Sequence, residues 1–274
     1  MNEDIGGWRI DLENYDSLNQ ITPDDVVMQL TGSYQEVTVD PRSVVKVENQ
    51  GSVGSCQGHS ISSCCEWCYI IASGDTSLQL SRAYGYYETQ RLDGISGDSG
   101  STINGGVKLA TEYGICREAL WPYSGRYNPQ RPKPIDELRA DAAKYKIGKT
   151  YRLRSYDAVR TFLGSGQGAV HLGITWNSTV NGPVVNSYRA GGGGGHAISL
   201  YSLSDRKDSQ GRPYCWMLNS WGKTWGNQGW AEWSPAAIEQ MLLARWSVFV
   251  GVSDMPNVKP REYSLDSLKK DLRI

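Results

Sequence analysis

The chain has 274 residues, and 28 Lys plus Arg against 29 Asp plus Glu give a formal net charge of −1. This balance gives no reason to expect a nucleic-acid or anionic-membrane surface, and no run of 18 apolar residues predicts a membrane-spanning helix. The first residues, Met1 to Asp4, lack the apolar region of a secretory signal.

The front half of the chain is predicted to be helical. Residues 1–40 are polar and form an N-terminal extension, with strand-like alternation only near Glu36–Val39. Apolar positions then repeat at helical spacing from Ser55 to Ala72, and Gly74 ends that helix. Further helices are expected from Gly105 or Gly106 to Tyr113, with Gly114 as the stop, and over Ile135–Lys146.

The back half contains short strand patterns separated by turns, followed by a charged tail over 254–274. A helical half before a strand-rich half predicts an α+β fold of two lobes, about 50–150 and about 151–253, with a groove between them. The expected strands are Ala169–Trp176, Ala197–Leu203, Cys215–Asn219, Gly229–Trp233 and Ser247–Val252.

The segment from Gln50 to Cys56 has the composition of a nucleophile loop. Its glycines permit a tight turn and a close approach to substrate. Cys56 then stands where the first helix begins, and free N–H groups at a helix N-terminus favour a thiolate and a developing oxyanion. The Gln50 amide can supply a second donor to that oxyanion.

Six cysteines do not form the pattern of a disulfide framework in a chain of this length. Cys64, Cys65 and Cys68 share one side of the expected helix. A metal site is the alternative there to small buried core residues. We expect core residues, and therefore no metal and no cofactor.

The chain has three histidines, so the choice of a general base is narrow. His196 follows the five glycines 191–195, which we expect to form a flexible loop, and begins a strand. His59 lies three residues after Cys56 and is the alternative base, but no orienting group is evident for it. His171 is expected to be a strand residue that faces the groove or the core.

Four motifs occur in the order typical of papain-like cysteine peptidases, which this chain resembles. The first is Asn49–Cys56, and the second is Gly105-Gly106-Val107 continuing to Trp121-Pro122-Tyr123. His196, within Gly195-His196-Ala197, lies 140 residues after Cys56, and Asn219-Ser220-Trp221-Gly222 begins 23 residues after His196. In papain-like peptidases the catalytic histidine and asparagine lie at a similar distance downstream of the cysteine.

The resemblance implies a papain-like peptidase domain over 41–253, with a helical N-terminal lobe and an antiparallel, β-barrel-like C-terminal lobe. It implies peptide hydrolysis through a thioester on Cys56, with His196 as acid and base, Asn219 as its orienter and Gln50 in the oxyanion hole. Trp221 would shield the histidine–asparagine bond. The residues expected to bind substrate are Gly105, Gly106, Ala169, Gly195 and Trp221.

Several positions depart from the family pattern. Val53 replaces a cysteine that secreted members pair in a disulfide, and Gln57-Gly58-His59 replaces Trp-Ala-Phe. These departures indicate a divergent bacterial or viral branch, located in the cytoplasm or associated with a virion. Residues 1–40 are short for an inhibitory pro-segment, so either none is needed or they block or brace the groove.

The expected partner is a peptide or protein substrate, with no nucleic acid and no membrane, and a virion or other protein assembly is a further candidate partner. An amidase or transamidase acting on cell-wall or isopeptide bonds would use the same residues. A non-enzymatic binding or virion protein of the same fold is the other alternative, and the intact set Gln50, Cys56, His196 and Asn219 argues against it.

Overall fold

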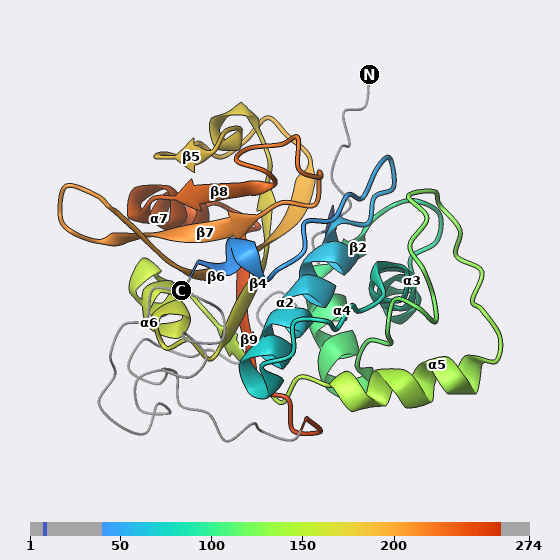
Figure 1. The fold of residues 1–274 in the computed structure, drawn as a ribbon. Coiled ribbons are helices and arrows are strands. Elements are labelled where there is room, and N and C mark those ends of the chain that lie inside the picture. Colours follow the sequence, from blue (N-terminus) through green and yellow to red (C-terminus); the bar gives the residue numbers. More distant parts are fainter. Residues whose placement is uncertain (1–7, 10–39, 259–274) are drawn as a thin grey trace.

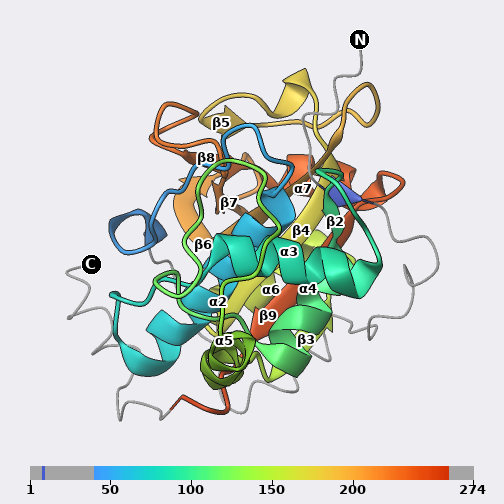
Figure 2. The ribbon, with the colours of Figure 1, turned by 90° about the vertical axis from the view of Figure 1, so that its right-hand side faces the viewer.

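The computed structural model describes residues 8–9 and 40–258. Helices α2 to α5 gather on one side of the molecule and an open sheet on the other, where α6 and α7 cover it (Figure 1). Seen from the helical side, α3, α4 and α5 lie in front of α2 (Figure 2). The helices are α2 (Cys56–Ser73), α3 (Arg82–Asp93), α4 (Ile103–Lys108), α5 (Ile135–Ala142), α6 (Tyr156–Gly164) and α7 (Pro235–Leu243).

Helix α2 runs through the centre of the protein. It begins at Cys56, and Gly74 ends it in the left-handed conformation with a φ of 73°, as the sequence predicted. It packs on α3 and on the sheet strands β4, β6 and β9, so it is buried on nearly all sides. A Cβ on Gly58 would lie 2.6 Å from the backbone nitrogen of Tyr86, so this glycine lets α2 and α3 approach closely.

The other helices show where local patterns suffice and where they fail. The second expected helix is α4 followed by a π-helical turn, Leu109–Tyr113, ended at Gly114. The third is α5 followed by a short 3-10 turn, Ala143–Tyr145. Helices α3, α6 and α7 were not predicted. Pro235 is the first residue of α7, a position where the N–H that proline lacks would have no partner within the helix, and Ser234 caps that helix.

The seven-stranded sheet has the order β3-β9-β4-β6-β7-β8-β5. Its pairs are antiparallel except β5 with β8, and β3 and β5 are its two edges, so the sheet is open and does not close into a barrel. The strands are β3 (Lys149–Arg152), β4 (Gly168–Thr175), β5 (Val184–Val185), β6 (Gly195–Lys207), β7 (Pro213–Leu218), β8 (Trp230–Trp233) and β9 (Val248–Ser253).

The sheet carries a hydrophobic cluster on each face. Because side chains alternate along a strand, β4 sends Ala169 into the cluster around α2 and Val170 and Leu172 into the cluster around α6 and α7. One face of the sheet therefore packs against α2, and the other face packs against α6 and α7. The five expected strands coincide with β4, β6, β7, β8 and β9 within a few residues.

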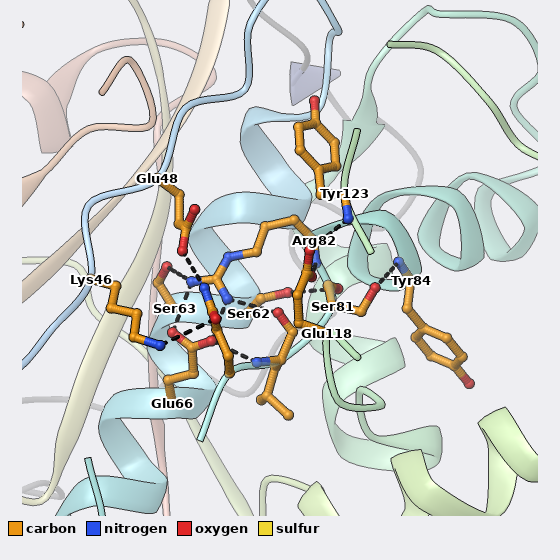
Figure 3. A network of polar contacts seen from close by, with 12 residues as sticks. Lys46, Glu48, Ser62, Ser63, Glu66, Ser81, Arg82, Tyr84, Glu118 and Tyr123 are labelled. Atoms are coloured by element: carbon orange, nitrogen blue, oxygen red, sulfur yellow. Dashed lines mark hydrogen bonds and ion pairs between the residues drawn. The ribbon is translucent and has the colours of Figure 1, made fainter. Parts of the chain in front are cut away.

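A buried ion pair links α2 to α3. The Arg82 guanidinium donates to the Glu66 carboxylate with a distance of 2.8 Å from Nη2 to Oε2, and both side chains are at most 5% exposed. Glu66 also accepts the Leu80 amide, and Arg82 donates to Ser63 (Figure 3). A buried polar group that loses its partner costs free energy, so this network favours a single arrangement of α2 and α3.

The expected strand near Glu36–Val39 and most of the two expected terminal segments lie outside the described residues. The division into an extension, two lobes and a tail remains a prediction. Among the residues that the structure describes, none of the helices is long and apolar enough to span a bilayer.

Candidate active site

Cys56 is the first residue of α2 and is fully buried. Its Sγ accepts a hydrogen bond from the backbone N–H of Ala197 at 3.3 Å. This contact crosses from the helix to the first residues of β6, 141 positions along the chain. The thiol therefore lies beside His196, at the positive end of the helix dipole.

The loop before Cys56 is held by hydrogen bonds from distant segments. Gln50 is buried, and its side-chain Nε2 donates to the Val53 carbonyl at 2.9 Å while its Oε1 accepts from Ser220 Oγ at 2.6 Å. Tyr123 donates its hydroxyl to the Gln50 carbonyl at 2.7 Å and lies 2.7 Å from Ser55 Oγ. The Gln50 amide is thus fixed at both its oxygen and its nitrogen, with one N–H hydrogen left to donate.

His196 and Asn219 meet across neighbouring strands. In the register of β6 with β7, Ser199 pairs with Leu218, so Asn219 continues opposite Ile198 and is a diagonal neighbour of His196. His196 Nε2 lies 2.8 Å from Asn219 Oδ1. An amide oxygen only accepts, so Nε2 carries the hydrogen and Nδ1 of the neutral ring is the basic nitrogen. His196 Nδ1 is buried without a hydrogen-bond partner among the described residues.

Aromatic rings cover this pair. The Trp221 ring lies 4.7 Å from the His196 ring at an interplanar angle of 31°. Trp176 lies edge-on to His196 at 4.9 Å and also contacts Trp221 at 5.0 Å. These rings keep water away from the bond between His196 and Asn219, which strengthens it electrostatically.

Burial lowers the pKa of His196 to about 4, and the hydrogen bond to Asn219 offsets part of this shift. The neutral imidazole is therefore the resting form unless a negative charge lies next to it. A thiolate on Cys56 would supply that charge, so an imidazolium at this position depends on the cysteine.

The structure brings together only part of the expected substrate-binding set. Trp221 lines an open pocket with His196, and Gly195 pairs with Thr175 at the start of β6. Gly105 and Gly106 are buried within α4, where added Cβ atoms would collide with Asp93 and Gln57. Ala169 is fully buried in the core beneath α2.

The other two histidines are buried in other polar contacts. His59 Nδ1 lies 3.0 Å from the Ser55 carbonyl, and its ring contacts Tyr123 edge-on at 4.6 Å. His171 Nδ1 lies 2.6 Å from Ser60 Oγ inside the core. Burial lowers the pKa of each ring to about 3, so both stay neutral near pH 7.

The cysteine cluster on α2 is part of the core. Cys64, Cys65 and Cys68 are at most 2% exposed and belong to the hydrophobic cluster around α2. Burial raises the pKa of the Cys64 thiol to about 12, and Cys68 Sγ donates to the Val252 carbonyl. No group of three or more candidate metal ligands occurs in the part of the chain that the structure describes.

Four supporting residues were not singled out from the sequence: Ser55, Asp98, Trp176 and Ser220. Asp98 accepts the Gly54 amide at 2.8 Å and the Tyr86 hydroxyl at 2.9 Å, which anchors the nucleophile loop to α3. Asp98 and Trp176 contact residues that lie far away in the sequence, so local patterns hold no signal for them. Ser55 and Ser220 stand within two of the motifs, directly before Cys56 and directly after Asn219.

A thiol at a helix N-terminus beside a His–Asn pair is the arrangement of enzymes that form a thioester with their substrate. The family described as papain family cysteine protease matches residues 36–245. The chain belongs to this family and is a papain-like cysteine peptidase.

Individual relatives agree with this assignment. An uncharacterized peptidase C1-like protein of Acanthamoeba polyphaga mimivirus is 24% identical over 264 residues, which span 88% of this chain and 81% of the relative. Peptidase 1 of Psoroptes ovis is 28% identical over 73% of this chain and 62% of its own length. The solved structure of xylellain, a cysteine protease from Xylella fastidiosa, covers 92% of this chain and 97% of its own, with a TM-score of 0.71 and 23% identity. The fold is therefore the expected papain-like one.

Proposed function

We propose that the protein is an endopeptidase that cleaves peptide bonds through a thioester on Cys56, with His196 as acid and base. One observation carries this proposal. His196 donates Nε2–H to Asn219, so its basic Nδ1 is left without a partner among the described residues, and the next residue, Ala197, contacts Cys56 Sγ. The nucleophile, the base and its orienter come from α2, β6 and the end of β7.

The reaction begins when Nδ1 of His196 takes the proton of the Cys56 thiol. The thiolate attacks the peptide carbonyl carbon, and the carbonyl oxygen becomes an oxyanion. The backbone N–H of Cys56 and the remaining Nε2–H of Gln50 donate to this oxyanion. The Gln50 bonds to Val53 and Ser220 hold the donor in place before substrate arrives.

His196 then returns its proton to the leaving amine, and the C–N bond breaks to give the thioester. Water attacks the thioester with His196 as the base, which releases the acid product and restores the thiol. Asn219 keeps the imidazole in the tautomer that both steps need.

The described part of the N-terminal extension supports a bracing role for residues 1–40. Trp8–Arg9 (β1) pairs in parallel with Ser101–Thr102 (β2), and Arg9 Nε donates to the Ser99 carbonyl. Trp8–Arg9 therefore lies next to the loop whose Asp98 accepts the Gly54 amide. We propose a cytoplasmic or virion-associated location, because Val53 replaces the cysteine that secreted members pair in a disulfide.

The proposal is tested with a mixed peptide library cleaved by wild-type protein beside Cys56→Ala. Wild type is expected to cleave internal bonds, and Cys56→Ala to lose all but a few per cent of turnover while unfolding at the same temperature. Iodoacetamide is expected to abolish the activity and a chelator to leave it intact. A parallel panel of cell-wall fragments and isopeptides separates a peptidase from an amidase. Turnover of those substrates alone would overturn the proposal.

A further inference from the structure

A large pocket opens next to His196, on the side where the proposed mechanism releases the amine product. It encloses about 820 Å³, and the rings of Trp176, Trp221 and His196 line it. The leaving amine takes its proton from His196, so the substrate residues after the cleaved bond lie on this side. The inference that follows rests on the proposed function and concerns what this pocket selects.

Gly191, Gly192, Gly193 and Gly194 line the pocket, and hydrogen bonds join this run to the Trp176–Asn177 segment. Asn177 Nδ2 donates to the carbonyls of Arg189 at 2.7 Å and Gly191 at 3.2 Å. The Trp176 amide donates to the Gly194 carbonyl at 2.8 Å. A Cβ on Gly193 would lie 1.6 Å from the Trp176 carbonyl oxygen, so only glycine fits there.

Arg189 gives the pocket its charge. It is the one side chain with a formal charge among the described residues that line the pocket. Its backbone is fixed, because its N–H donates to Thr179 Oγ1 at 3.3 Å and its carbonyl accepts from Asn177. The guanidinium itself has no hydrogen bond or ion pair within the described part of the chain. A guanidinium with free donors matches a carboxylate, which it binds through two parallel hydrogen bonds.

We propose that Arg189 selects substrates with a carboxylate on the leaving side of the cleaved bond. Two substrates present this chemistry: a peptide with an acidic side chain at that position, and a short leaving segment that ends in its own C-terminal carboxylate. The hydrogen bonds to the side chains of Asn177 and Thr179 hold the Arg189 backbone in the lining of the pocket, which Trp176, Trp221 and His196 also line.

Two matched pairs of peptides distinguish these substrates. All four share the residues before the cleaved bond. The first pair carries Glu or Gln on the leaving side within a long neutral segment, and the second ends two residues after the bond in a free carboxylate or an amide. We expect kcat/KM of wild type to favour the carboxylate in at least one pair by about tenfold, the lower range for a charge-assisted hydrogen bond.

Substitution of Arg189 then tests the residue. Arg189→Gln is expected to bring that ratio close to one, and Arg189→Glu to reverse it in favour of the neutral peptide. Because the contact lies near solvent, the wild-type ratio is also expected to fall as salt is raised from low to high concentration. Arg245→Gln is the matched control, since Arg245 is exposed and lies over Trp246, outside this pocket.

A wild-type ratio near one in both pairs would overturn the inference, and so would a ratio that Arg189→Gln and Arg245→Gln leave equally unchanged. Either of these two ratios would leave the proposed function standing, because the neutral peptides would still be cleaved. The proposed function fails separately, when Cys56→Ala cleaves the same peptides as fast as wild type.

Discussion

Asn219 Oδ1 accepts two hydrogen bonds, one from His196 Nε2 at 2.8 Å and one from the backbone N–H of Ser220 at 2.8 Å. The second donor belongs to the backbone of the next residue and fixes the side-chain oxygen, so the amide presents its oxygen to the imidazole. The orienter of His196 is therefore itself oriented before substrate binds.

Asn219→Ala is expected to lower kcat on the order of 10²-fold, because the imidazole loses its fixed tautomer and orientation. Steady-state kinetics on one library-derived peptide measure the effect. Asn128→Ala, in an exposed turn outside the site, serves as the control. Wild-type kcat in Asn219→Ala would show that Trp221 and the strand alone position the ring.

The two candidate bases are separated by substitution. His196→Ala removes the proton acceptor beside Cys56 and is expected to lower kcat by a factor on the order of 10²–10⁴. His59→Phe keeps the ring that packs edge-on against Tyr123 and is expected to retain measurable turnover. The reverse pattern would make His59 the base and His196 a structural residue.

The sequence predicted those parts of the molecule that depend on neighbours along the chain. Helix α2 follows from apolar spacing and a glycine stop, and Cys56 could be placed at its start. Helix α3 was not predicted from the sequence. Its buried residues include Tyr84, Tyr86 and Tyr87 with Gly85 among them, which weakens both the apolar periodicity and the helix propensity.

The same limit applies to the site. Gln50, Cys56, His196 and Asn219 could be named in advance because each stands in a short recognisable motif. Tyr123 reaches Gln50 across 73 positions, and no local pattern records such a contact. Gly106 lies against Gln57 because of how α4 crosses α2. The local sequence around Gly106 does not determine this crossing, and neither does the local sequence around Gln57.

Glu66 and Arg82 are expected to behave as a coupled pair. Glu66→Ala leaves the Arg82 guanidinium buried without its counterion, so the free energy of unfolding is expected to fall by about 3–5 kcal/mol. The double variant Glu66→Leu, Arg82→Met removes both charges and is expected to lose less than Glu66→Ala alone. Urea unfolding of the single and double variants measures this coupling, and additive losses would contradict it.

Three buried histidines are expected to make stability fall as the pH falls below 7. Burial holds the pKa of His59 and His171 at about 3 and that of His196 at about 4, whereas the same rings in the unfolded chain titrate near 6.5. Between these values the unfolded state binds more protons than the folded state, so protonation favours unfolding. From pH 7 to pH 5 each ring is expected to cost about 2 kcal/mol of the free energy of unfolding.

Urea unfolding of wild type and His59→Phe at pH 7 and pH 5 isolates one of these contributions. The phenylalanine does not titrate, so the variant is expected to lose about 2 kcal/mol less than wild type over the same interval. The comparison uses the change between the two pH values, so any effect of the substitution that does not depend on pH cancels. Equal losses in the two proteins would mean that His59 takes up its proton in the folded state, which its contact with Ser55 and its burial against Tyr123 argue against.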